Sequence, residues 1–177
     1  MIALQHGAET RAELAADADA FIKAHRRHLL GPIARLSADR AALRWQRGFV
    51  RVVSFREYVD PSLLLLPVAL LLAEVTAVRL SPDACERLST RRGARQVESL
   101  NLGAHQAGGP PGSMVHHGDL SALPRAFPRL KRLVLRGNFG PLGLELPLLR
   151  ELDFEGPTPP WLAQAQALKL ERRALRC

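Results

Sequence analysis

The sequence has 177 residues, of which 47% are hydrophobic, 24% are charged and 5% are aromatic, and its formal net charge is +8. This length and apolar content suffice to bury one core, so a disordered chain is excluded and one domain or one continuous array is expected. The charge by itself indicates solubility and nonspecific attraction to anions, and the few aromatic residues argue against a stacking platform for single-stranded nucleic acid.

Cysteine content and hydropathy indicate the compartment. Cys85 and Cys177 form neither a disulfide framework nor a metal-ligand spacing, which fits a reducing environment. The N-terminus has no secretory signal pattern. The most apolar run, residues 63–73, is about half of the ~20 residues that a bilayer span needs, and it contains Pro67. We therefore expect a cytoplasmic protein without a membrane segment.

The first expected elements are a helix over residues 8–30, ended by Gly31 and Pro32, and a hairpin over residues 43–55. Together they predict an N-terminal helical and hairpin cap over residues 1–48, whose aromatic side chains seal the open end of a core. The apolar residues with these roles are Leu14, Ala18, Phe21, Ile22 and Leu29 on one face of the helix, and Trp45 and Phe49 in the hairpin.

Residues 49–177 contain a recurring apolar pattern. The stretch LKRLVLRGN, residues 130–138, has leucine at its first, fourth and sixth positions and Asn138 at its ninth. The fourth and sixth positions of a short strand point to the same side, and the first reaches that side from the entering chain. Five copies start 25, 22, 33 and 19 residues apart, which is typical of a leucine-rich repeat with one long insertion. The copies are Val50, Val53 and Phe55; Val75, Val78 and Leu80; Val97, Leu100 and Leu102; Leu130, Leu133 and Leu135; and Leu149, Leu152 and Phe154.

The pattern predicts an α/β fold, a short irregular leucine-rich-repeat solenoid with parallel strands on the concave side and helices or turns on the convex side. Convex helices are expected over residues 60–74 and 82–93, and a short helical turn within residues 120–129. Residues 103–119 are rich in glycine and proline and predict an inserted loop, the most mobile part of the chain.

The C-terminal residues 159–177 must cover the last strand, and two structures compete for them. One is a sixth strand after a helical turn at residues 161–164, which we favour because Ala165, Leu168 and Leu170 keep the repeat spacing. The other is a capping helix, which the side-chain propensities favour. In either structure Trp161 should lie near Leu152 and Phe154.

Three short motifs, MIALQ, AHRRHLLGPIARL and LRWQRGFVRVVSF, precede the repeats in this order. This arrangement resembles bacterial leucine-rich-repeat proteins that carry a repeat-companion domain, in which a helical N-terminal segment leads directly into the repeats. The chain starts just after the place where that family has an ADWLEERGD-like motif, so we expect an N-terminal truncation or a misassigned start. The resemblance implies a non-enzymatic interaction module whose partner is undetermined.

Residues that could carry chemistry form no recognisable site. His116 and His117 are adjacent in an extended loop and should point apart, so a solvated loop is favoured over a metal site with Asp119. His25 and His28 share a helix face, but the arginines between them would repel a cation. No G-x-S-x-G or phosphate-loop pattern occurs. We expect no catalytic residue, no metal and no cofactor.

The outward-pointing third, fifth and seventh positions of each copy predict a binding surface on the concave side. Arg132 should face Glu151, and Arg136 should face Glu155, across one strand spacing of ~4.8 Å. Such pairs could form only a charge ladder worth at most ~1 kcal/mol each, or they could orient a protein partner on a surface that is basic on its early strands and acidic on its last. The expected partner-binding residues are Arg56, Arg79, Asn101, Arg132, Arg136, Glu151, Asp153 and Glu155.

The sequence therefore predicts a non-catalytic protein-binding module. One alternative is nucleic-acid or anion binding by the arginine pairs at residues 26–27, 91–92 and 172–173, provided that they converge on one face. A second alternative is a degenerate fragment without an independent function, because the N-terminal motif is missing.

Overall fold

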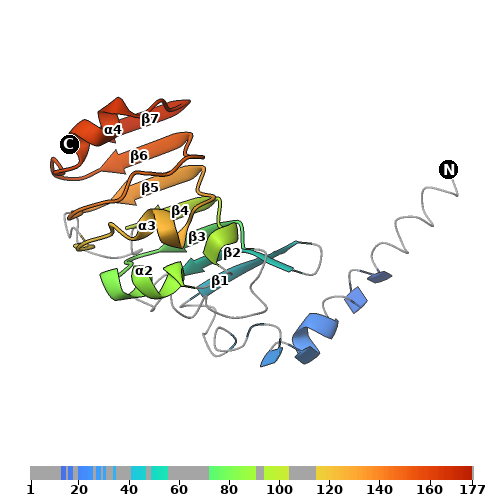
Figure 1. Cartoon of the computed structure of the whole chain (residues 1–177). Coiled ribbons are helices and arrows are strands. Elements are labelled where there is room, and N and C mark those ends of the chain that lie inside the picture. Colours follow the sequence, from blue (N-terminus) through green and yellow to red (C-terminus); the bar gives the residue numbers. More distant parts are fainter. Residues whose placement is uncertain are drawn as a thin grey trace, which may run out of the picture.

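The computed structural model describes residues 13–14, 16–17, 20–25, 27–28, 30, 34, 41–46, 49–55, 72–90, 94–103 and 115–176, and structural statements concern this part of the chain. It is an α/β structure built on one seven-stranded, mostly parallel sheet (Figure 1). Its elements are β1 (Ala41–Gln46), β2 (Phe49–Phe55), β3 (Glu74–Ala77), α2 (Pro82–Ser89), η3 (Ala94–Gln96), β4 (Ser99–Leu102), α3 (Leu123–Ala126), β5 (Arg132–Arg136), β6 (Glu151–Glu155), α4 (Leu162–Ala167) and β7 (Arg172–Arg176).

The strands follow one another in the sheet in the order in which they follow one another in the chain. Strands β1 and β2 are antiparallel, as expected for the predicted hairpin, and each later strand is parallel to the one before it. A parallel neighbour requires the chain to cross back to the starting edge before each new strand. The sheet therefore grows by one strand for each return of the chain.

Two inner rows of side chains, taken from alternate positions of successive strands, form the core. In the first inner row Val53 lies beside Val75, which lies beside Leu100, and Leu133 and Leu152 continue the row. These five side chains are at most 1% exposed. Burial of this much aliphatic surface is the main stabilising term, at roughly 1.5–3 kcal/mol for each fully buried Val or Leu.

The second predicted copy is wrong in its register. Val75, and not Val78, lies in the first inner row, and Ala77 follows in the second inner row beside Leu102. The copy is therefore Leu72, Val75 and Ala77, all 1% exposed. Val78 and Leu80 are also buried, because the chain stays close to the core after β3, so two overlapping sets of residues satisfy the same spacing.

Helices α2, α3 and α4 lie on the inner side of the sheet, and their buried residues belong to the same core as the inner rows (Figure 1). Helix α2 begins at Pro82, and the Ser81 hydroxyl accepts a hydrogen bond from the Ala84 amide at 3.2 Å. The predicted helix over 82–93 thus exists and ends at Ser89, while α3 confirms the predicted helical turn. The predicted helix over 60–74 is wrong for residues 72–74, which are not helical and lead into β3 at Glu74, and its remainder lies outside the described residues.

Glycine allows the chain to turn tightly where successive strands end. Gly103, directly after β4, has a φ of +79°, and a Cβ at this position would collide with the carbonyl of Arg136. A Cβ on Gly156, after β6, would collide in the same way with the Gly137 carbonyl. Only glycine lets neighbouring turns of backbone approach this closely.

The end of the predicted loop insertion is packed rather than solvated. His116 forms a parallel bridge with Asn138, and Leu120 forms one with Leu142. His117 is fully buried, whereas His116 is exposed, so the two histidines do point apart. The expectation of a solvated loop is wrong for His117, because its ring packs flat against Phe139. Residues 104–114 lie outside the described part.

The predicted apolar face of the N-terminal helix is not buried where the structure describes it. The described residues between 13 and 30 are helical, but Leu14 is 64% exposed and Phe21 is 58% exposed. Leu30 alone among them is buried against the core. Trp45 packs against the core as predicted, while the side chain of Phe49 lies outside the described residues, as do Ala18 and Leu29.

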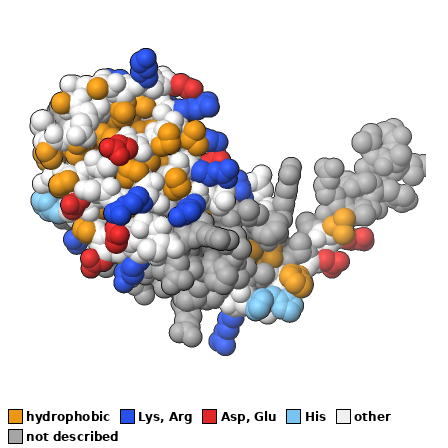
Figure 2. Space-filling model, viewed as in Figure 1, with side chains coloured by type: hydrophobic (Ala, Val, Ile, Leu, Met, Phe, Trp, Pro, Cys, Tyr) orange, Lys and Arg blue, Asp and Glu red, His pale blue; other side chains and the backbone are white. Residues whose placement is uncertain are grey.

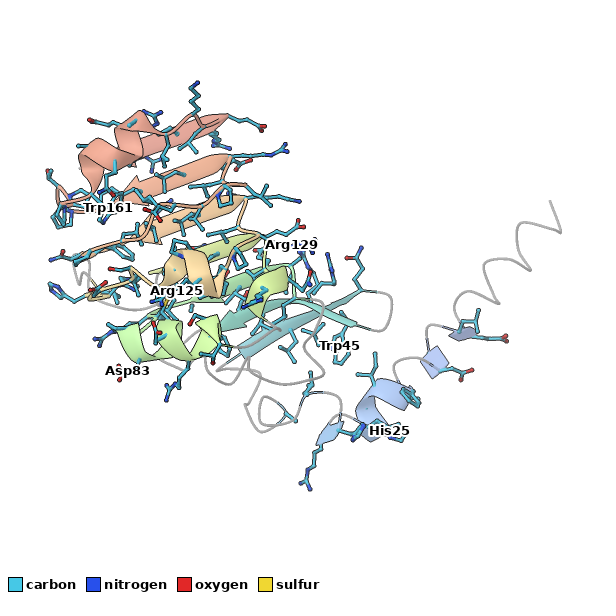
Figure 3. All side chains as sticks on the ribbon, viewed as in Figure 1. His25, Trp45, Asp83, Arg125, Arg129 and Trp161 are labelled. Atoms are coloured by element: carbon cyan, nitrogen blue, oxygen red, sulfur yellow. The ribbon has the colours of Figure 1, made fainter. Side chains whose placement is uncertain are left out.

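The C-terminal segment forms a strand, as we favoured, but in a later register than predicted. Strand β7 pairs with β6 so that Arg173 lies beside Leu152 and Leu175 lies beside Phe154. The predicted phase at Ala165, Leu168 and Leu170 is wrong, because residues 162–167 form α4 instead. Trp161, labelled in Figure 3, packs edge-on against Phe154 with ring centroids 5.0 Å apart, which confirms the predicted contact.

Candidate functional site

The side of the sheet opposite the inner rows carries three outer rows of side chains, which we call the strand face. The first outer row is Val52, Glu74, Ser99, Arg132, Glu151 and Arg172; the second is Ser54, Thr76, Asn101, Val134, Asp153 and Ala174; and the third is Arg136, Glu155 and Arg176. Successive side chains of a strand point to opposite sides, so these rows follow from the same register as the core.

The strand face is polar but uncharged on its early strands after β2, apart from one carboxylate. Thr76, Ser99 and Asn101 are each partly exposed. The one carboxylate is that of Glu74 on β3, which lies beside Ser99 in the first outer row. Val134 is only 7% exposed and lies in register between Asn101 and Asp153. The middle of the strand face is therefore more enclosed than its two flanking rows.

The late strands carry an acidic strand between two basic ones. Arg132 Nε lies 3.4 Å from Glu151 Oε2, and Arg136 Nε lies 3.2 Å from Glu155 Oε2. Both pairs confirm the predicted register of β5 and β6. On the other side of β6, Arg176 Nη1 lies 3.4 Å from the same carboxylate of Glu155. Glu155 therefore bridges arginines from β5 and β7.

Arg136 is the most enclosed charge in this group. Its Nη2 donates to Asp153 Oδ2 at 2.9 Å, in addition to the contact with Glu155, and its side chain is 22% exposed. Its Nη1 also donates to the Leu135 carbonyl at 3.2 Å. An arginine held by two carboxylates and a carbonyl has a more fixed geometry than the exposed Arg132 pair, which is worth at most ~1 kcal/mol.

The predicted charge polarity of the surface is wrong in part. Arg79 does not belong to an outer row, because the corrected register of β3 places Glu74 and Thr76 there, and Arg79 follows the strand in an exposed position. Arg56 lies outside the described residues. On the described early strands the basic residue of this surface is Arg44 of β1, beside Val52, and the acidic strand β6 is followed by β7, which adds Arg172 and Arg176. Asn101, Arg132, Arg136, Glu151, Asp153 and Glu155 do lie together on the strand face.

Residues 172–173 were predicted only as an arginine pair for nucleic acid, and the arginines of β7 were not placed on the strand face, although a signal for them exists. Strand β5 reads RLVLR and strand β7 reads RRALR, so both have arginine at their first and last positions with leucine at the fourth. The exception is Arg173 at the second position, where the core would need an apolar residue. Its guanidinium turns aside, and donates to the carbonyls of Gln166 at 2.9 Å and Leu168 at 2.6 Å.

A second set of ion pairs joins neighbouring turns of the chain just before the strands begin. Lys131 Nζ lies 3.0 Å from Glu98 Oε1, and Arg150 Nη1 lies 3.2 Å from Glu171 Oε1. Figure 2 shows Lys and Arg side chains interleaved with Asp and Glu on the visible side of the molecule. The surface that the structure describes is therefore mixed in charge rather than uniformly basic.

Two titratable groups outside the strand face are strongly perturbed by burial. Burial, together with electrostatic repulsion from Arg79 and His116, lowers the pKa of His117 to about 4, although the nearby Arg136 backbone partly opposes this shift. Burial raises the pKa of the Cys85 thiol to about 12. Both shifts favour the neutral form, so neither group is prepared for acid–base or nucleophilic chemistry at neutral pH.

Within the described ranges, no group of three or more His, Cys, Asp or Glu side chains is arranged to hold a metal ion. The helices that the structure describes are also too short or too polar to cross a membrane. Comparisons of the chain with protein-family models, with curated proteins and with solved structures gave no match. The strand face is therefore interpreted from its geometry and its chemistry.

Proposed function

We propose that the chain is a short, irregular leucine-rich-repeat solenoid that binds a protein partner on its strand face. The proposal takes residues 49–177 as the repeat array and residues 1–48 as its N-terminal cap, in line with the resemblance to bacterial proteins with a repeat-companion domain. Its structural support is the strand order, which equals the sequence order, and the inner rows that recur at each return of the chain.

The observation that carries the binding proposal is the distribution of side chains between the two sides of the sheet. The described helices contribute to the core on one side, whereas the strand face presents partly exposed polar residues and a charge network. A row of charges on a rigid sheet has a fixed spacing, so it can select a partner by the position of complementary charges. Strands position such groups more accurately than loops do.

The chemistry of the network favours a protein partner over a nucleic acid. Its late half holds four arginines and three carboxylates, so its net charge is +1. A phosphate backbone approaching Arg132 or Arg172 would also meet the carboxylate of Glu151 between them. A protein surface with both signs of charge can satisfy this arrangement, and a polyanion cannot.

The arginine-pair alternative receives no support from the described residues. Arg173 is occupied by the carbonyls at the end of α4, and Arg172 points from the opposite side of β7. Arg27 lies on the N-terminal helix, while residues 26, 91 and 92 lie outside the described part. A convergent basic surface therefore has no geometric basis among the residues that can be placed.

Site-specific photocrosslinking tests the proposal. A photoreactive phenylalanine analogue is placed at Ser99, on the strand face, and in a matched control at Glu86, which is exposed on α2. In the cells that express the protein, the Ser99 probe should capture a discrete protein that the Glu86 probe does not capture. Adding Arg132→Glu should weaken the capture. Equal capture from both probes, or capture only from Glu86, would place the binding surface elsewhere.

A further inference from the structure

Strand β7 ends the sheet, and one of its two edges has no neighbour among the described strands (Figure 1). The Arg172 amide donates to the Arg150 carbonyl at 3.1 Å, and the Arg176 carbonyl accepts from the Gly156 amide at 3.0 Å. In a parallel pair, alternate residues bond to the same neighbour, so Arg172, Ala174 and Arg176 use their backbone groups toward β6. The N–H and C=O groups of Arg173 and Leu175 therefore point to the free edge.

The core is thinly covered beside this edge. Leu168, Leu170 and Leu175 pack against the core but are only partly buried, in contrast to their equivalents in the preceding turns. Figure 2 shows hydrophobic side chains at the surface of the end of the molecule that carries α4 and β7. An added strand would bury this apolar surface and satisfy the backbone groups of the edge at the same time.

The outer rows define the charges that an added strand would meet. Along the first outer row Arg132 is followed by Glu151 and then by Arg172, and along the third outer row Arg136 is followed by Glu155 and then by Arg176. Both rows thus end on an arginine that has a carboxylate on one side only. Arg172 makes no ion pair within the described part of the chain, and Arg176 is 63% exposed.

We propose that the free edge of β7 binds an extended acidic segment of another protein as an additional strand. The segment has carboxylates four residues apart to face Arg172 and Arg176, and apolar residues at the second and fourth positions to cover the end of the core. Strand β6, ELDFE, shows that this pattern fits beside the same arginine spacing. The pattern reads the same in both directions, so a parallel or an antiparallel strand can satisfy it.

A second copy of this chain is a poorer occupant of the edge. Antiparallel pairing of two β7 strands about Ala174 would place Arg172 opposite Arg176 of the other copy, and this would happen twice. Like charges directly opposite each other destabilise a strand pair. Arginines on an edge also protect it from unwanted pairing, so simple protection is the competing explanation of these residues.

Fluorescence anisotropy on the full chain tests whether the arginines of β7 bind an acidic strand or only protect the edge from unwanted pairing. The probe is a labelled peptide whose centre is ELTVE, and its matched control has KLTVK in the same flanking sequence. We expect the acidic peptide to bind at least about tenfold more tightly than the basic one, a difference of ~1.4 kcal/mol. Arg172→Glu should abolish this preference, and Arg172→Glu with Arg176→Glu should reverse it.

Leu175→Pro tests whether the contact is strand addition. The substitution removes an N–H that points to the free edge and leaves the hydrogen bonds to β6 in place. Proline is tolerated at such a position of an edge strand. Binding of the acidic peptide should fall at least about tenfold, while Arg125→Glu, on α3, should leave it unchanged. If Leu175→Pro does not fold, the charge reversals at Arg172 and Arg176 still test whether the edge prefers the acidic peptide.

Equal binding of both peptides, or no binding of either, would mean that the arginines only protect the edge and would overturn the proposal. The outcome is separate from that of the strand-face proposal, because the photocrosslinking probe at Ser99 lies on β4, whereas the peptide experiment changes residues of β7.

Discussion

His117 lies flat against Phe139, with ring centroids 4.0 Å apart and ring planes within 4° of each other. The imidazole is fully buried, and neither of its nitrogens has a hydrogen-bond partner among the described residues. Buried polar atoms are normally paired, so this ring is held by stacking and by the backbone bridge at His116 rather than by its own polarity. Protonation would place a charge in this buried site, where Arg79 and His116 repel it.

This burial predicts a pH-dependent stability. The pKa of His117 falls from 6.5 to about 4 in the folded chain because burial disfavours the charged form. As the pH falls, the unfolded chain therefore binds a proton before the folded chain does. The stability that the folded chain gains from keeping His117 neutral is fully present above pH 6.5. It is lost as the pH falls from 6.5 toward about 4, by about 3 kcal/mol at most. Urea denaturation at pH 7 and at pH 5 measures the difference.

His117→Phe keeps the stack and removes both unpaired nitrogens. At pH 7 the free energy of unfolding should be unchanged or higher by about 1 kcal/mol, and the loss toward pH 5 should become smaller than in the parent chain. The matched control, His116→Phe, changes the exposed neighbour and should keep the pH dependence. An identical pH dependence in the parent and in His117→Phe would show that other groups cause it.

The inner row predicts a large loss from one core substitution. Leu133 is fully buried between Leu100 and Leu152, so Leu133→Ala should leave a cavity that its neighbours cannot fill. The free energy of unfolding should fall by roughly 2–5 kcal/mol in a chemical melt. Arg132→Ala, one residue away on the strand face, should cost less than ~1 kcal/mol. A loss below 1 kcal/mol for Leu133→Ala would contradict its central place in the core.

The two arginines of β5 should differ in their coupling to β6. Arg136 contacts two carboxylates and is 22% exposed, whereas Arg132 contacts Glu151 alone and is 55% exposed. Double-mutant cycles with alanine should give ~1 kcal/mol or more for Arg136 with Asp153, and less than ~0.5 kcal/mol for Arg132 with Glu151. The reverse order would mean that enclosure by neighbouring strands does not strengthen these pairs.

Cys85 should be chemically inert in the folded protein. It is fully buried on α2, and burial raises the pKa of its thiol to about 12. In a Cys177→Ser variant, the rate of reaction with a disulfide reagent at pH 8 should be about a thousandfold lower than in denaturant, because the thiolate is the reactive form. A fast reaction under native conditions would show that α2 opens readily from the sheet.

The sequence predicted the strand register correctly where only one set of apolar residues fitted the repeat spacing. The hairpin, β5 and β6 follow strong alternation, and the pairs Arg132–Glu151 and Arg136–Glu155 follow from that register. For β3, the small side chain of Ala77 hides the true spacing, while Val78 and Leu80 imitate it. Periodicity alone cannot distinguish two overlapping apolar sets when both are buried.

The remaining errors come from polar residues in buried or inner positions. Arg173 occupies an inner position of β7, and only its bonds to the carbonyls of Gln166 and Leu168 explain how the strand tolerates it. His117 was assigned to a solvated loop because residues 103–119 are rich in glycine and proline, yet Phe139 covers its ring. Both cases depend on contacts between segments far apart in the sequence or on side-chain bonds, which a residue pattern does not record.

The register of β2 to β6 underlies the core and the strand face, and methyl NMR measures it directly. In a sample with labelled Val and Leu methyl groups, nuclear Overhauser effects should join Val53 to Val75, Val75 to Leu100, and Leu133 to both Leu100 and Leu152. Val75→Ile and Val78→Ile variants assign the two valines of this region. Contacts from Val78, rather than from Val75, to both Val53 and Leu100 would shift β3 by three residues and contradict the arrangement of the strand face.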